Sequence, residues 1–164
     1  MLFRSPGFFR VDRPEAAPYL APGGHTLYFS SVARGGPGQL DLFVADINAY
    51  GVVTGFALLP SSAAEENMPV VTDDQRALFF ARDSTVSARD IWVVGRQDDF
   101  PPYGVLSQVT PVAQDIPQEV VELSSIHDEF PSWVSSDACR LYFISNRPVL
   151  GTSRYRVWVA EKPM

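Results

Sequence analysis

At 164 residues, with 46% hydrophobic and 12% aromatic content, the chain can bury the core of a single domain spanning residues 1–164. The formal net charge of −6 and the dispersion of the 13 Lys and Arg residues argue against nucleic acid as a partner, because phosphate binding needs clustered basic side chains. No apolar run approaches the roughly 18 residues of a membrane-spanning helix, so no membrane span is predicted.

The predicted elements are all strands. A short strand at residues 7–11 precedes a unit that recurs three times. Each copy has a short strand that begins with proline, a polar turn, an apolar strand and, after a loop, a third strand that carries an aromatic residue. In chain order these strands are residues 18–20, 25–30 and 41–45, then 69–71, 76–81 and 90–94, then 131–134, an apolar strand up to residue 143, and 156–160.

A fourth strand is predicted at the end of the first copy, within residues 52–59. In the second copy two segments compete for this place, residues 105–109 and residues 119–123. The second is preferred because Leu123-Ser124-Ser125 resembles Leu59-Pro60-Ser61-Ser62, which also precedes an acidic pair.

The spacing of the copies supports a repeat. Pro18 and Pro69 are 51 residues apart, and Pro131 follows 62 residues after Pro69, so the last interval contains an insertion. Periods near 50 with about four strands each are typical of β-propeller blades. The sequence therefore predicts an all-β fold with three four-stranded antiparallel blades, at residues 15–59, 66–123 and 128–160, and an outer strand at 7–11.

Several residue types recur at fixed places in the copies. The prolines fit the first position of a strand because they lack an N–H. The second strands supply the aromatic core between blades. An aspartate that opens the third strand can accept hydrogen bonds from loop N–H groups, or it can line a site; Arg156 takes its place in the third copy. The recurring positions are Pro18, Pro69 and Pro131; Phe29, Phe80 and Phe143; Phe43, Trp92 and Trp158; and Asp41 and Asp90.

No motif for chemistry is found. The sequence has no phosphate-binding glycine loop and no nucleophile elbow, and His25 and His127 lack metal-ligand spacing. Cys139 is predicted to be a buried structural thiol. No catalytic residue, metal or cofactor is predicted. Recognition is assigned to the loops between the second and third strands, at Arg82, Arg147, Arg154 and Tyr155.

The segment DEFPSWVSSDACRLYFISNRP, with RVWVAEKP after it, resembles the TolB-type, WD-like β-propeller repeat, and the two earlier copies follow the same pattern. The resemblance implies a propeller used for protein or ligand recognition, often in the periplasm or cell envelope of bacteria. It implies no common chemistry.

Three blades are fewer than the four to eight of closed propellers, so two readings stay open. The chain is half of a six-bladed ring completed by a second copy, or a fragment of a longer propeller. The expected function is a non-catalytic module that recognises a protein or small ligand. The alternatives are a propeller module of a larger hydrolase or lyase, and a carbohydrate binder that uses Tyr103 and Tyr155.

Overall fold

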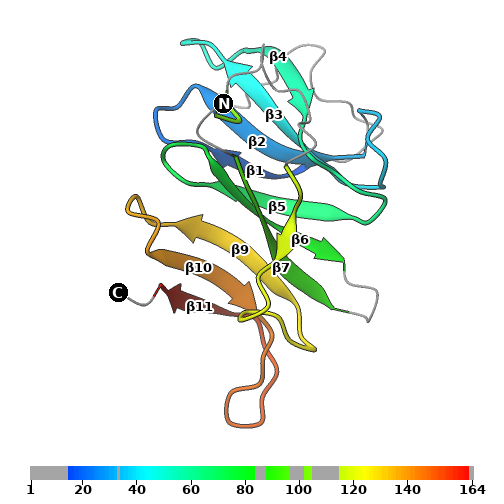
Figure 1. Ribbon diagram of the computed structural model, residues 1–164, viewed down its shortest axis with the longest axis vertical. Coiled ribbons are helices and arrows are strands. Elements are labelled where there is room, and N and C mark those ends of the chain that lie inside the picture. Colours follow the sequence, from blue (N-terminus) through cyan, green and yellow to red (C-terminus); the bar gives the residue numbers. More distant parts are fainter. Residues whose placement is uncertain (1–14, 33, 84–87, 97–101, 105–114, 163–164) are drawn as a thin grey trace.

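A computed structural model describes residues 15–32, 34–83, 88–96, 102–104 and 115–162 of the chain. This part is built from strands that form three antiparallel sheets (Figure 1). The first sheet contains β1 (Glu15–Leu20), β2 (Thr26–Ser31), β3 (Asp41–Ile47) and β4 (Val53–Leu58). The second contains β5 (Glu66–Val71), β6 (Ala77–Asp83), β7 (Arg89–Gly95) and β8 (Gln118–Glu119). The third contains β9 (Glu129–Val134), β10 (Arg140–Ser145) and β11 (Arg156–Glu161).

The strands follow one another within each sheet in chain order, as the repeat predicts. The first strands of the three sheets are β1, β5 and β9, and β5 contacts both of the others. These three strands are called the inner strands here. No helix in the described ranges has the length and apolar character needed to cross a bilayer. The predicted all-β class with three antiparallel sheets is confirmed, but in the described residues the third sheet has three strands and not the predicted four.

The predicted strand at residues 119–123 is wrong in extent. Only Gln118 and Glu119 pair with β7. Val120 still donates its N–H to the Ile91 carbonyl, at 2.8 Å, but Leu123 then donates to the Val120 carbonyl, at 2.9 Å, and closes a turn. The turn places Val120 and Leu123 against the core between the second and third sheets. The competing segment 105–109 and the strand at 7–11 lie outside the described residues.

The recurring prolines do not begin the inner strands, as the sequence analysis expected. Each inner strand begins two or three residues earlier, at an acidic residue, and the proline lies at a β-bulge in the pairing with the second strand. A bulge leaves one residue unpaired, so the missing N–H of proline is tolerated there. Ala17 and Met68, which precede Pro18 and Pro69, have positive φ values of 48° and 52°.

The bulge also explains a difference in spacing between the copies. Pro131 is one residue further from Leu141 than Pro18 is from Leu27. The closing pairs of the three hairpins, Leu20–Leu27, Val71–Leu78 and Val134–Leu141, have the same separation. In β9 the proline occupies an earlier position of the bulge, opposite Phe143, and Ser132 is the extra residue. The hairpin length is therefore constant and only the place of the proline changes.

The four-residue turn after each inner strand holds its fourth residue in the left-handed region. This residue is Gly24, Gln75 or Ala138, with φ of 73°, 55° and 55°. In the third sheet Ser135 Oγ and the Cys139 N–H both donate to Asp137 Oδ1, at 2.5 and 3.0 Å, which fixes the turn. A residue other than glycine is strained at such a φ. Cys139 is exposed in this turn, so the prediction of a buried thiol was wrong.

We expect Ala138→Gly to stabilise the protein by about 0.5–1 kcal/mol, because glycine adopts the left-handed conformation without strain. The free energy of unfolding from denaturant titration measures the effect. The matched control is Gly24→Ala, at a position where an added Cβ meets no atom within 4 Å and φ is 73°. It should lose about 1 kcal/mol, since only the backbone conformation opposes it. A loss of stability in Ala138→Gly would contradict the assignment of strain.

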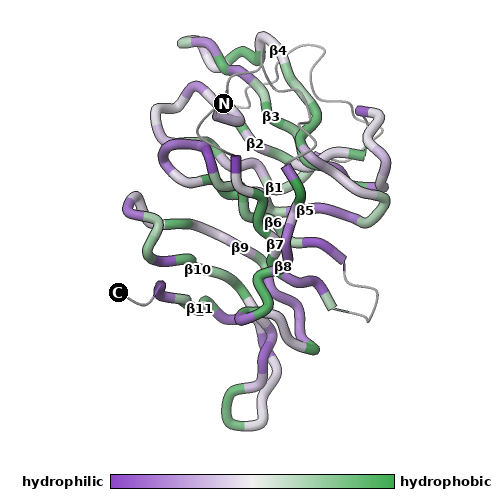
Figure 2. The backbone as a smooth tube through the Cα atoms, in the orientation of Figure 1, coloured by the Kyte–Doolittle hydropathy of each residue, from purple (hydrophilic) through white to green (hydrophobic). Residues whose placement is uncertain are grey.

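The apolar faces of neighbouring sheets form two continuous cores. Tyr28, Leu42 and Val44 of the first sheet pack against Leu78 and Phe80 of the second. The other face of the second sheet packs against the third, where Leu141 and Phe143 are buried. Figure 2 shows hydrophobic stretches along the strands that face these contacts. The side chains of β2 alternate between its two faces, because Phe29 lies with Phe43 and Ala45 on the opposite face from Tyr28.

Polar contacts between sheets accompany the first core. The Tyr28 hydroxyl donates to Gln75 Oε1 at 2.8 Å, and the Tyr19 hydroxyl donates to the Val71 carbonyl at 3.3 Å. Tyr103, from the insertion in the second copy, is completely buried in the same core, with the Arg96 guanidinium 5.0 Å from its ring centre. Tyr103 is therefore not available for the carbohydrate contact considered from the sequence.

Tyr28→Phe should destabilise the protein by about 1 kcal/mol, because the half-buried Gln75 side chain loses its hydrogen-bond donor while the ring stays in place. The change in thermal unfolding midpoint, roughly 2–4 °C lower, measures it. Tyr50→Phe is the control, since the Tyr50 side chain is 89% exposed and its loss of a hydroxyl should leave the midpoint unchanged. An unchanged midpoint in Tyr28→Phe would show that this bond adds nothing to the contact between sheets.

Candidate recognition surface

A buried glutamate begins each inner strand and is held by an arginine from the end of the second strand or the loop after it. Arg82 Nε donates to Glu66 Oε1 at 3.0 Å, and Arg147 Nε donates to Glu129 Oε1 at 2.9 Å. Arg34 Nη2 donates to Glu15 Oε1 at 2.6 Å. Serine hydroxyls complete the sites in the later copies, from Ser62 to Glu66 and from Ser125 and Ser145 to Glu129. The same arrangement thus recurs in all three sheets.

Two of the predicted recognition residues belong to these internal sites. Arg82 lies in β6, with its side chain 12% exposed and its guanidinium 4.3 Å from the Trp92 ring centre. Arg147 is 24% exposed, lies 5.5 Å from the Phe143 ring centre and also donates to the Leu123 carbonyl. Both side chains hold the connection that leads into an inner strand. Arg154 and Tyr155 are exposed, so the structure does not group the four residues.

The aspartates that open the third strands brace loops, as one of the two readings predicted. Asp41 Oδ1 accepts the Gly38 N–H at 3.0 Å, and Asp90 accepts the backbone N–H of Ser125. Burial raises the pKa of Asp90, and the neighbouring carboxylates of Glu119 and Glu129 raise it further. Burial likewise raises the pKa of Asp41. Each aspartate therefore lies near the buried glutamate of the next sheet, a relation that the sequence pattern alone did not reveal.

The raised pKa of Asp90 makes a prediction for pH dependence. The folded state binds the Asp90 proton more tightly than the unfolded state, so this group costs stability as the pH rises above its unfolded pKa. Asp90→Asn keeps an oxygen for the Ser125 N–H and removes the charge. Its unfolding midpoint should exceed that of the native protein by about 2–4 °C near pH 7, and the difference should shrink near pH 4.

Asp74→Asn is the control, for which the expected change in stability has the opposite sign. The Thr72 hydroxyl and then the Arg76 N–H lower the pKa of Asp74, so its charged form stabilises the turn and the substitution should destabilise the protein at neutral pH. Equal effects of Asp74→Asn and Asp90→Asn at neutral pH, measured by thermal unfolding, would contradict the burial of Asp90 beside a second carboxylate.

Close to Asp90, the loop ends of the second and third sheets form a partly exposed cluster, called the rim cluster here. At its centre is Arg89, whose Nε donates to Asp83 Oδ1 at 2.6 Å and whose Nη2 lies 3.5 Å from Glu65 Oε2. Burial lowers the pKa of Arg89, but the pair with Asp83 and the charges around it outweigh this and raise it. The members of the rim cluster are Glu65, Asp83, Arg89, Asp128, Phe130 and Tyr155.

The third sheet contributes the aromatic side of the rim cluster. The Tyr155 hydroxyl donates to Asp128 Oδ2 at 2.7 Å, which raises the pKa of Tyr155. The other oxygen, Asp128 Oδ1, accepts the backbone N–H of Arg89 at 3.2 Å. The Asp128 carboxylate therefore joins the second sheet to the third. The Phe130 ring centre is 6.1 Å from that of Tyr155 and 5.8 Å from the Arg89 guanidinium. The cluster is held by several contacts, yet Tyr155 is 56% exposed.

Next to the rim cluster, the connection between β10 and β11 projects from the sheet (Figure 1). Its tip is hydrophobic in Figure 2, and Leu150 is completely exposed there. Val149 and Thr152 pair with each other and hold the projection in a hairpin. Arg154 and Tyr155 lie in the segment that returns to β11. Of the predicted recognition residues, these two are placed on the surface, while sequence reasoning missed Arg89 and Phe130.

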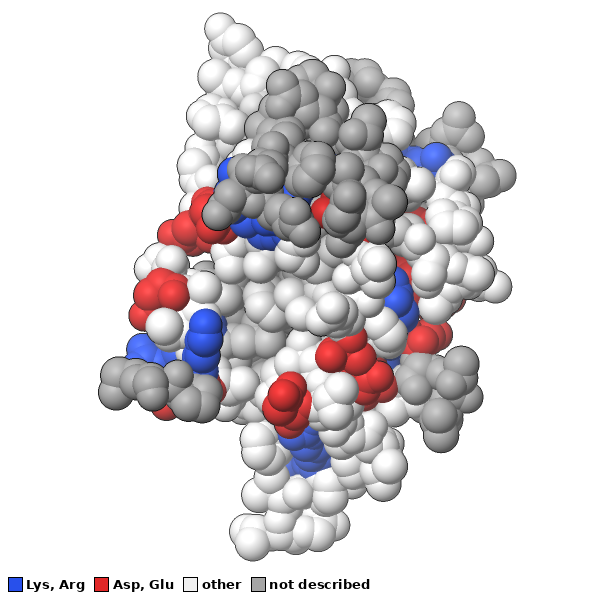
Figure 3. Space-filling view, viewed as in Figure 1, with Lys and Arg blue, Asp and Glu red and all other residues white. Residues whose placement is uncertain are grey.

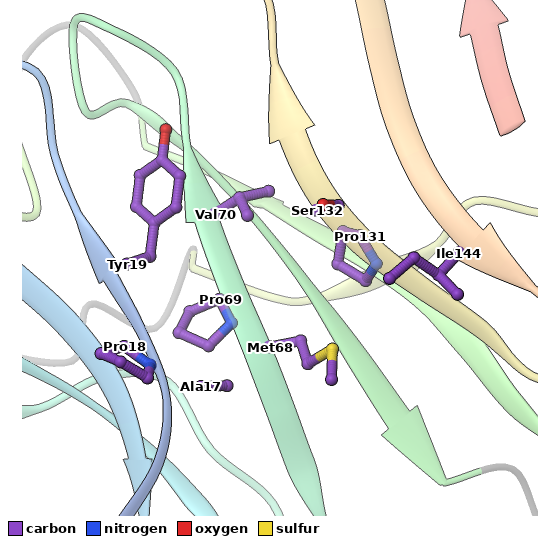
Figure 4. Close-up of a pocket in the computed structure, with 9 residues that line it drawn as sticks. All are labelled: Ala17, Pro18, Tyr19, Met68, Pro69, Val70, Pro131, Ser132 and Ile144. Atoms are coloured by element: carbon purple, nitrogen blue, oxygen red, sulfur yellow. The ribbon is translucent and has the colours of Figure 1, made fainter. Parts of the chain in front are cut away.

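A second feature is a shallow hollow where the inner strands converge. It has a volume of about 180 Å³ and is lined mainly by apolar side chains around the bulges of β1, β5 and β9. Figure 4 shows Pro18, Pro69 and Pro131 on three different strands around it. On the face drawn in Figure 3, acidic and basic side chains are interspersed, and no basic patch is seen.

The remaining residues considered from the sequence are dispersed. His25 is exposed in the first turn, and His127 lies in the connection before β9. Among the residues that the structure describes, no group of three or more His, Cys, Asp or Glu side chains is placed to hold a metal ion.

Comparison with known proteins gives a structural likeness only. Neither a protein-family model nor a curated protein sequence matches this chain. Among solved structures, a puromycin-hydrolyzing peptidase from Mycobacterium tuberculosis is similar, with a TM-score of 0.53 and 15% sequence identity. The match covers 90% of this chain and 20% of that chain, so this chain spans about a fifth of the length of that protein. At this identity the likeness shows the fold alone.

Proposed function

We propose that the chain is a non-catalytic recognition module of the TolB-type β-propeller class and that the rim cluster binds an exposed segment of a partner protein. The observation that carries the proposal is the exposed aromatic and charged surface that Asp128 joins across two sheets. Its geometry is held in place before any partner arrives, which lowers the entropy lost on binding.

The radial arrangement of a propeller is supported by three features. The inner strands contact one another in succession, the same faces of successive sheets form the cores, and the bulged prolines surround one hollow. In such an arrangement the connections between second and third strands gather at one end with the connections that lead into inner strands. The rim cluster draws its residues from both kinds of connection.

The chemistry of the rim cluster favours a basic partner segment with an apolar or aromatic residue. The carboxylates of Glu65 and Asp83 pair with the Arg89 guanidinium, and the carboxylate of Asp128, which accepts the backbone N–H of Arg89, adds a third negative charge nearby. The ring of Tyr155 and the side chain of Leu150 offer exposed apolar surface beside them. Small-molecule sites are usually concave, whereas the connection between β10 and β11 that carries Tyr155 projects from the sheet, so a protein segment fits this surface better.

A selection from a displayed peptide library tests this proposal. We expect enriched peptides to carry Lys or Arg next to an aromatic residue, and Tyr155→Ala to weaken their binding at least about tenfold, as for an interface aromatic anchor. The control is Tyr50→Ala, at a still more exposed tyrosine in the connection between β3 and β4, which should bind normally. Peptides that bind both variants equally, or no enrichment at all, would refute the rim cluster as the recognition surface.

A second candidate is a propeller module of a larger hydrolase. It is favoured by the likeness to a peptidase of which the match covers only 20%. The chain would then guide substrates or hold another domain, and the chemistry would come from elsewhere in the protein. A catalytic domain in the same reading frame as this sequence would support the second candidate, and its absence from the gene would refute it.

A further inference from the structure

An open hollow lies between the second and third sheets, beside the turn that joins β9 to β10. It has a volume of about 360 Å³ and is lined mainly by apolar side chains of both sheets, with charged groups at its edge. The rim cluster includes the connection that follows the other end of β10, so the two sites are separate. The lining residues on which the argument depends are Phe79, Leu141, Ala138, Cys139, Ala160 and Lys162.

In the contact between the first and second sheets, the ring of Tyr103 fills the corresponding place. Tyr103 is completely buried there, and its N–H donates to the Gln75 carbonyl at 3.1 Å. The Arg96 guanidinium lies 5.0 Å from its ring centre, and Tyr28 and Val94 belong to the same core. Each of these neighbours has a counterpart that lines the hollow. By strand pairing and turn position, Tyr28, Gln75, Val94 and Arg96 correspond to Phe79, Ala138, Ala160 and Lys162.

The second contact is less completely filled than the first. No described residue places a ring where Tyr103 lies in the first contact, and Ala138 and Ala160 stand where that contact has glutamine and valine. The surrounding side chains are therefore less covered, since Leu141 is 7% exposed whereas its counterpart Leu78 is completely buried. The hollow thus corresponds to the space of one ring and of the side-chain atoms that its neighbours lack.

We propose that this hollow binds a small molecule through a flat aromatic ring of the size of a phenol or an indole. The apolar lining favours a ring over a polar ligand, and the volume falls within the roughly 300–1,000 Å³ of small-molecule sites. Lys162 takes the place of Arg96, so an ammonium group is available to the face of the ring. The ligand is independent of the partner segment proposed for the rim cluster.

Cys139 gives a direct test, because it is the only cysteine of the chain, is exposed and lines the hollow. The native chain is equilibrated with the disulfide of 2-phenylethanethiol or of 2-cyclohexylethanethiol at a fixed concentration of 2-mercaptoethanol. The Cys139 thiolate attacks the reagent disulfide and releases one thiol, so the equilibrium yield of mixed disulfide reports how well the attached group fits. Mass spectrometry of the intact protein measures this yield.

We expect the phenyl group to be captured at least about threefold better than the cyclohexyl group, because only the aromatic ring gains from the nearby cation. Free 4-methylphenol, which is the side chain of tyrosine as a separate molecule, should compete with the phenyl group. Equal capture of the two groups, or no competition by 4-methylphenol, would overturn the proposal. The second result would mean that a ring enters the hollow only when a longer chain carries it.

Two phenylalanine substitutions on β11 form a matched pair. Ala160→Phe places a ring in the hollow and should abolish the preference for the phenyl group. Val157→Phe introduces the same side chain on the opposite face of β11, at a residue that is 71% exposed, and should keep the preference. Lys162→Ala should reduce it. A preference that persists in Ala160→Phe, or that is lost in Val157→Phe, would contradict the placement of the ligand.

The native chain with free 4-methylphenol still decides the question if Ala160→Phe does not fold. Peptides selected on the rim cluster should bind equally well to the native chain and to the chain that carries the phenyl group on Cys139. Failure of the proposed ligand site is therefore separable from failure of the proposed function.

Discussion

The structure depends on the burial of apolar faces between neighbouring sheets. A strand with alternating large side chains leaves apolar surface on both sides, and a single sheet cannot bury either. In this chain β2, β6 and β10 put leucine and phenylalanine on one side and an aromatic residue on the other. Stacking one sheet on the next is the solution that uses the same residues each time. The repeat in the sequence is thus a repeat of contacts between sheets as much as of the sheets themselves.

Polar groups hold the connection that leads into each inner strand. The glutamate at the start of an inner strand is removed from water, and an unpaired buried charge is costly, so it needs the arginine and the serine that meet it. The arginine in turn lies over aromatic rings of its own sheet, which favours one orientation of the guanidinium. The connection between two sheets is therefore held at the point where it enters the next inner strand. The rim cluster stands on this support, because Asp128 directly precedes Glu129.

Much of the fold was predictable because its signals are local. Strand type, chain order and the faces of β2 follow from alternation and from the spacing of Leu27, Leu78 and Leu141. The place of proline was mispredicted, since a bulge depends on pairing with the neighbouring strand. The exposure of Cys139 was missed because the turn extends one residue further than its composition indicates. The strand at 119–123 was overestimated because Val120 and Leu123 are apolar for another reason, their contact with the third sheet.

The candidate site was less predictable than the fold. Of the residues that the sequence analysis assigned to recognition, Arg154 and Tyr155 are exposed in the loop between β10 and β11, but Arg82 and Arg147 are used inside the protein. Only the positions of Glu66 and Glu129 in space distinguish these arginines from exposed ones. The sequence contains one weak indication that Arg89 belongs to the candidate site, namely its position directly before the recurring Asp90. Its relation to Asp128 and Phe130 requires two sheets to be adjacent, which no local pattern shows.

The buried position of Tyr103 bears on how such repeats change over time. The insertion that makes the last interval longer also delivers a large ring into the core between the first two sheets, beside Arg96. Trimming that segment to restore an even spacing would leave a void where the ring now lies. An extra stretch of chain acquired as an irregularity has here become a structural component, and idealising the repeat would remove part of what holds the molecule together.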